Sequence, residues 1–126
     1  MKKSKFQNKN IIVSFKYAFE GLFTALKTER NLRVDTFVML LVCIMGLIFK
    51  INRVEWAVCI IMFASVISAE VINTVVEVVV DMITEEYNKK AKLAKDLAAA
   101  SVLIKAGAAF AVGLFIFIPR IVDLLR

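Results

Sequence analysis

Residues 56–81 read WAVCIIMFASVISAEVINTVVEVVVD, and this stretch decides the fold. Residues 56–69 carry no charge. After them, Glu70, Asn73, Glu77 and Asp81 follow at steps of three, four and four residues. These steps place all four side chains on one face of an α-helix. A carboxylate inside a bilayer costs roughly 2.5–3.5 kcal/mol. We therefore expect this acidic stripe to face protein, a water-filled groove or a partner subunit.

The composition places the whole chain in a membrane. Of its 126 residues 60% are hydrophobic, whereas about half are apolar in an ordinary soluble domain. The 17 basic and 11 acidic residues give a net charge of +6, and a basic surface beside apolar spans favours anionic lipid over nucleic acid as its partner. The length predicts a single membrane domain covering residues 1–126.

The predicted fold is all-α, with a surface helix followed by three transmembrane helices. We expect the surface helix at about 11–27 and the spans at about 29–49, 55–80 and 97–118. Residues 81–96 contain no Gly or Pro and are expected to stay helical outside the membrane, and Pro119 is expected to end the last span.

Apolar residues at steps of three and four make residues 11–27 amphipathic, which is typical of a helix lying in the membrane interface. Packing on other protein is the alternative. The apolar residues of this face are Ile11, Ile12, Phe15, Phe19, Leu22, Phe23 and Leu26.

Basic residues predict the orientation. Eight Lys or Arg residues precede Val34, and four more lie within 81–96, whereas the other ends of the spans carry few. The positive-inside rule therefore places the N-terminus and the 81–96 segment in the cytosol.

The residue inventory narrows the chemistry. The chain has no His, which excludes His-based acid–base, zinc and triad chemistry. Cys43 and Cys59 lack CxxC spacing and are expected to be reduced, packed thiols.

Carboxylates suit Mg²⁺ with bound phosphates, and one can serve as a general base toward a hydroxyl. Lys95 could offset phosphate charge. Phosphoryl transfer fits these parts, although the chain has neither a GxxxxGK[ST] nor a GxGxxG loop. The spacing alone also permits a proton- or cation-coupled transporter, or a structural polar seam between helices.

Three motifs together resemble the prokaryotic diacylglycerol kinase family, which includes the undecaprenol kinases of Gram-positive bacteria. The resemblance covers roughly Phe15 to Ile118. The motifs are ERNLR at 29–33, EVINTVVE at 70–77 followed by Asp81, and AKDLAAA at 94–100.

The resemblance implies a homotrimer with active sites shared between subunits, in the bacterial plasma membrane. It implies that Glu70 is the catalytic base and binds the acceptor lipid together with Asn73. It also implies that Glu29 and Glu77 bind Mg²⁺ and ATP.

Further positions follow from the same resemblance. Lys95 and Asp96 match a nucleotide-binding pair. Tyr17, Glu86 and Asn88 match positions near ATP, and Arg33 and Ala99 match lipid-substrate positions. The alternatives are an interfacial aromatic for Tyr17, a snorkelling side chain for Arg33 and a solvated helix face for Glu86.

The ERN-x-R form and the Lys-rich chain look more like the Gram-positive branch. We therefore expect an ATP- and Mg²⁺-dependent kinase that acts on undecaprenol, with diacylglycerol as the alternative acceptor. A non-enzymatic or ion-coupled membrane protein is the remoter alternative. Lys105, inside the third predicted span, has no role that the resemblance supplies.

Overall fold

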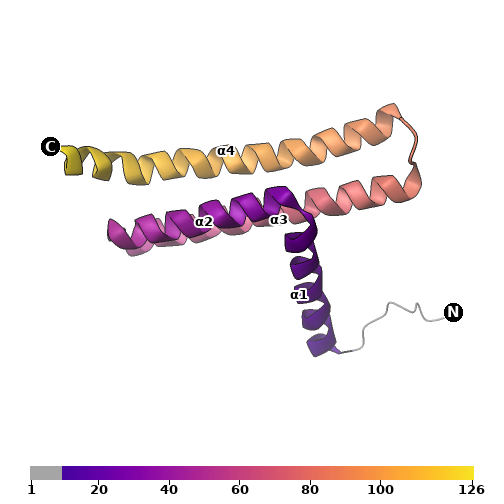
Figure 1. Ribbon diagram of the computed structural model, residues 1–126, viewed down its shortest axis with the longest axis horizontal. Helices are drawn as coiled ribbons and strands as arrows, with labels where there is room; N and C mark the ends of the chain where they lie inside the picture. Colours follow the sequence, from indigo (N-terminus) through magenta and orange to yellow (C-terminus); the bar gives the residue numbers. More distant parts are fainter. Residues whose placement is uncertain (1–9) are drawn as a thin grey trace.

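The computed structural model describes residues 10–126, which form four α-helices (Figure 1). The helices are α1 (Ile11–Thr28), α2 (Arg30–Ile48), α3 (Arg53–Ile83) and α4 (Lys89–Leu125). Helices α2, α3 and α4 are each long and apolar enough to cross a membrane. The prediction of an all-helical chain with three such helices is confirmed.

Helix α1 runs crosswise to the other three, which lie side by side along the long axis of the molecule (Figure 1). Ala25 is its one buried residue. Its large aromatic side chains are exposed, with Phe15, Phe19 and Phe23 each more than 60% accessible. These aromatic side chains therefore do not pack within the described chain, and the placement of α1 in a membrane interface stays a prediction.

The turn between α2 and α3 is built by capping. Lys50 adopts a left-handed backbone with φ 51°. The Asn52 side chain accepts a hydrogen bond from the Glu55 amide at 2.9 Å, and the Glu55 carboxylate accepts one from the Asn52 amide at 2.8 Å. This capping box satisfies amides at the start of α3 that have no intrahelical partner. Ile51, within the turn, is buried.

A close contact joins α2 to α3 next to this turn. A Cβ added at Gly46 would lie 2.8 Å from the Trp56 ring. Since the ring is held within the core, a side chain at Gly46 would force α2 and α3 apart. The core cluster below it is small and consists of Ile51, Cys59, Ile116 and Phe117.

The connection between α3 and α4 corrects one expectation. Residues 84–88 are not helical, so the prediction of a continuous helix over 81–96 is wrong there. Thr84 has an extended backbone, and the Asn88 side chain accepts hydrogen bonds from the Lys90 and Ala91 amides. Thr and Asn side chains offer the backbone local partners that compete with helix continuation. The break lets α4 fold back along α3.

Pro119 does not end the last helix, which is a second correction. Helix α4 continues through it to Leu125. The Arg120 guanidinium donates to the Ile116 carbonyl at 2.7 Å and forms two hydrogen bonds with the Glu55 carboxylate at 2.7 and 2.9 Å. A proline removes a backbone donor from the preceding turn, and here the Arg120 side chain supplies a donor to that turn while it ties α4 to α3.

Candidate active site

Glu70 is the centre of the site. Its side chain is 5% exposed, and it is the one buried charged residue in the part of the chain that the structure describes. The charged groups that act on it are Asp35, Glu29 and Glu77, all of them carboxyl groups. Burying a carboxylate without a cation is costly, and among residues 10–126 no Lys or Arg is one of the groups that act on Glu70.

Asn73 lies one turn from Glu70 on α3. Its Nδ2 donates to Glu77 Oε1 at 3.4 Å, whereas its Oδ1 is buried without a hydrogen-bond partner. A buried acceptor of this kind costs free energy until a donor meets it. A donor such as a ligand hydroxyl fits this position.

Glu29 reaches the stripe from the bend between α1 and α2. Its backbone is extended, and its amide donates to the Ala25 carbonyl at 2.8 Å, so the same residue ends α1 and begins α2. The charge of Glu29 acts on Glu70, so the bend brings Glu29 near the acidic stripe of α3, and its role with Mg²⁺ and ATP stays a prediction.

Arg33 has a structural partner that the sequence did not indicate. Its Nη1 donates to the Lys27 carbonyl at 2.7 Å and to the Leu26 carbonyl at 3.3 Å. These are carbonyls of the last turn of α1, which lack intrahelical donors and favour a cation. Arg33 thus fixes the angle between α1 and α2, and a contact of Arg33 with lipid stays a prediction.

Lys95 reaches across from α4 to the outer end of the stripe. Its Nζ lies 2.6 Å from Asp81 Oδ1, and the two side chains are 39% and 61% exposed. Asp96 instead pairs with Lys92 on its own helix. Exposed ion pairs contribute little free energy, so Lys95 could exchange Asp81 for a phosphate at small cost.

The other predicted nucleotide and lipid positions lie away from Glu70 in sequence and on different elements. Tyr17 is 53% exposed on α1, and Ala99 is exposed on α4. Glu86 lies in the connection before α4, where its amide donates to Thr84 Oγ1. Asn88 uses its side-chain oxygen to cap α4. Their contacts with ATP or lipid stay predictions.

The donor set near Glu29 and Glu77 fits a metal that arrives with its substrate. Among residues 10–126 no three carboxylates, thiols or imidazoles group closely enough to hold a metal ion by themselves. Mg²⁺ is commonly held by one or two carboxylates together with substrate phosphates and water. Two glutamates beside a nucleotide would meet that requirement.

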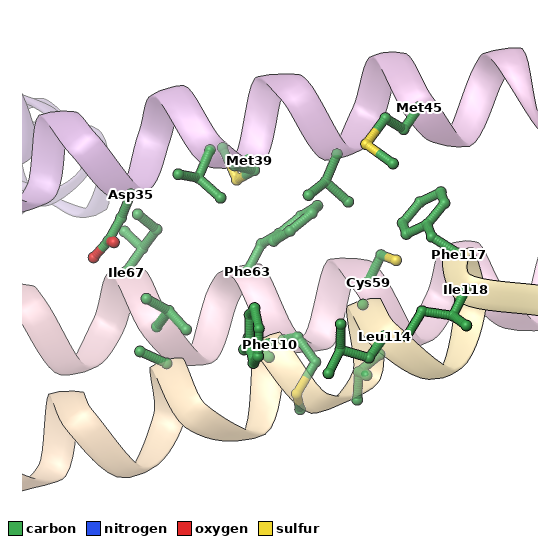
Figure 2. A pocket seen from close by; sticks show the side chains of 18 of the residues that line it. Asp35, Met39, Met45, Cys59, Phe63, Ile67, Phe110, Leu114, Phe117 and Ile118 are labelled. Carbon is green, nitrogen blue, oxygen red and sulfur yellow. The ribbon is translucent and has the colours of Figure 1, made fainter. Parts of the chain in front are cut away.

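A groove opens beside the acids, and Asp35 lies at one end of it (Figure 2). Its volume is about 560 Å³, and Asp35 is the one charged residue among side chains contributed by α2, α3 and α4. The sequence analysis gave Asp35 no role. The sequence does show an acid, Asp35, on the span before the one that carries Glu70. Recognising that the two acids lie at the same depth requires the register between α2 and α3.

Comparison with known proteins shows which family the chain belongs to. The model of the family described as prokaryotic diacylglycerol kinase matches residues 16–117. The chain belongs to this family. It is 33% identical over 108 residues to the undecaprenol kinase of Bacillus subtilis, with 86% of this chain and 88% of that protein covered.

Two further relatives are named diacylglycerol kinases. The diacylglycerol kinase of Synechocystis is 36% identical over 117 residues, which cover 92% of this chain and 67% of the relative. The diacylglycerol kinase of Escherichia coli strain K12 is 30% identical over 94 residues, covering 75% and 77%. The protein is therefore a lipid kinase of the membrane, and the predicted family and enzyme class are confirmed.

Proposed function

We propose that the protein transfers the γ-phosphate of ATP to the hydroxyl of undecaprenol at the cytosolic face of the bacterial plasma membrane. The observation that carries the proposal is Glu70, a carboxylate 5% exposed on a transmembrane helix and surrounded by other acids. A carboxylate in such a place is suited to accept a proton from a hydroxyl.

The described residues divide the reaction between them. Glu70 accepts the proton of the lipid hydroxyl, and Asn73 Oδ1 offers that hydroxyl, or its water, an acceptor that no residue of 10–126 uses. Glu29 and Glu77 would hold Mg²⁺ together with the ATP phosphates, and Lys95 would leave Asp81 for a phosphate oxygen. Bound Mg²⁺ supplies positive charge that offsets charge on the transferring phosphoryl group.

The proposal includes a homotrimer with shared sites, and α1 lying in the membrane interface on the cytosolic side. Two observations support it. No cation of residues 10–126 acts on Glu70, and the described helices leave most of their large apolar side chains exposed. Lipid and neighbouring copies would cover those side chains.

The choice of undecaprenol rests on the relatives and on local sequence. The Bacillus subtilis protein that is covered over 88% of its length is named an undecaprenol kinase. Glu29, Arg30, Asn31 and Arg33 form the ERN-x-R pattern of that branch, and the chain carries a net charge of +6. Diacylglycerol is the alternative acceptor because other relatives are named diacylglycerol kinases.

Phosphate transfer to the two lipids, measured in matched detergent micelles with purified protein, ATP and Mg²⁺, separates these acceptors. We expect a higher kcat/KM for undecaprenol than for diacylglycerol. A preference for diacylglycerol would replace the acceptor while leaving the reaction class intact.

A further inference from the structure

Lys105 is a cation within an apolar helix, and the kinase mechanism does not use it. It lies on α4 between Ile104 and Ala106 and is exposed. Among residues 10–126 no carboxylate lies within ion-pair distance of it. A lysine at membrane depth is costly without a partner, so a positive charge remains to be explained.

The register of α3 against α4 gives the depth of Lys105. Lys95 contacts Asp81, and Arg120 contacts Glu55 near the other end of the antiparallel pair. Lys105 lies ten residues along α4 from Lys95, and ten residues back along α3 from Asp81 is Val71. Lys105 is therefore level with Glu70.

Lys105 nevertheless does not reach its own acids. Ala106 and Ala109 line the groove that contains Asp35, whereas Lys105 does not. The charged groups that act on Glu70 do not include it. Its side chain therefore leaves the helix pair on a side other than the groove.

The surface around Lys105 permits close approach of another helix. Ser101 and Ala108, one turn to either side, are small and exposed. A Cβ added at Gly107 would meet nothing within 4 Å, so packing within the chain does not require glycine there. Small residues on a membrane helix let a second helix backbone come near.

Asp35 is the complementary charge. It is partly exposed, it is the one charged residue of the groove, and it lies close enough to act on Glu70, which places it at the same depth as Lys105. Within residues 10–126, one surface thus offers a cation without an ion-pair partner at this level, and another offers an acid without one.

We infer that a second copy of this chain covers the groove, and that Lys105 of that copy pairs with Asp35 at the groove's end. The two surfaces differ, so the contact is head-to-tail, and such contacts close into rings when the rotation permits. The inference rests on the proposed oligomeric kinase and deepens it: each copy supplies a positive charge beside the Asp35 and Glu70 carboxyl groups of its neighbour.

Cross-linking between two differently tagged chains tests the contact. One chain carries Asp35→Cys and the other Lys105→Cys, both in a Cys43→Ala, Cys59→Ala background, and a short bismaleimide is added to membranes from cells that express both. We expect a product containing both tags. Val34→Cys in place of Asp35→Cys is the control and should give far less product, because adjacent residues face different sides of a helix.

A charge swap read by oligomer mass tests the same pair without introduced cysteines. Lys105→Asp and Asp35→Lys should each lower the association constant of the oligomer at least about tenfold, equivalent to about 1.4 kcal/mol. The double variant should restore it, and Lys105→Arg should retain it. Since these readouts are of assembly, they remain informative even if no lipid is phosphorylated.

Three outcomes would overturn the inference. One is cross-linking only between chains that carry the same substitution. Another is an assembled oligomer that gives no product with both tags, as expected if lipid fills the groove. The third is single charge reversals that leave the oligomer unchanged, as expected if Lys105 snorkels to the interface.

Discussion

Glu70 and Glu77 lie two turns apart on α3, and their surroundings differ. Glu70 is buried, whereas Glu77 is partly exposed and accepts a hydrogen bond from Asn73. The deeper carboxylate suits proton transfer away from water, and the outer one suits a metal that arrives with ATP. The proposed roles of the two glutamates therefore follow their depth.

Replacing Glu77 tests the metal role. Glu77→Gln removes one anionic oxygen ligand, so the Mg²⁺ concentration that gives half-maximal rate should rise about ten- to hundredfold. The measurement is lipid phosphorylation at saturating ATP over a Mg²⁺ series. Glu85→Gln, exposed in the connection before α4, is the matched control. An unchanged Mg²⁺ requirement in Glu77→Gln would remove Glu77 from the metal site.

Single residues show where sequence prediction succeeds and where it stops. The steps of three and four correctly place Glu70, Asn73 and Glu77 on one helical face because helix geometry is local. Asp35 was missed because its closeness to Glu70 depends on the register between two helices, which spacing along one helix does not contain. Arg33 was expected either to bind lipid or to snorkel, whereas in the structure its guanidinium donates to carbonyls at the end of α1.

At the scale of the elements, two predictions were wrong: a continuous helix over 81–96, and the end of the last helix at Pro119. Side-chain hydrogen bonds at the helix ends and around the proline account for both. Thr84 ends α3 and Asn88 begins α4 without any Gly or Pro between them. Pro119 fails to stop α4, where Arg120 donates to the Ile116 carbonyl and binds Glu55 across the helix pair. A rule about one residue type cannot include a partner 65 positions away in the chain.

The ion pair between Arg120 and Glu55 should stabilise the α3–α4 pair. Its side chains are 28% and 21% exposed. Arg120→Ala leaves the Glu55 carboxylate without its cation, which we expect to cost about 1–3 kcal/mol. Thermal unfolding in detergent should show a lower Tm, and the double variant with Glu55→Ala should fall by less than the sum of the single variants.

A control for this prediction is Lys16→Ala, which removes a pair whose side chains are 71% and 57% exposed. It should change stability by less than about 0.5 kcal/mol. If Arg120→Ala proved equally neutral, the ion pair would not be what holds α4 against α3 beyond Pro119.

At the scale of the whole molecule, three long apolar helices require the two ends of the chain to lie on opposite sides of the membrane. The basic residues before Val34 and within 81–96 predict a cytosolic N-terminus. This orientation places Glu29, Glu77 and Lys95 on the side where ATP is present. The helices agree with the sequence prediction, whereas orientation and assembly depend on the bilayer and on other copies.

Labelling with a membrane-impermeant maleimide tests the orientation. In a Cys43→Ala, Cys59→Ala background, Glu85→Cys should react only after cells are permeabilised, because it lies in the connection between α3 and α4. Arg126→Cys, at the opposite end, should react in intact cells. The reverse pattern would place the proposed site outside the cell, away from ATP.

The most direct test of the central claim is ATP consumption by purified protein in micelles containing undecaprenol and Mg²⁺, compared between wild type and Glu70→Gln. The account predicts that wild type forms one undecaprenyl phosphate for each ATP consumed. It predicts that Glu70→Gln, with unchanged assembly, loses at least about a hundredfold in rate because the proton acceptor is gone. A Glu70→Gln variant as active as wild type would contradict the account, and so would wild type that consumes no ATP in response to undecaprenol or diacylglycerol.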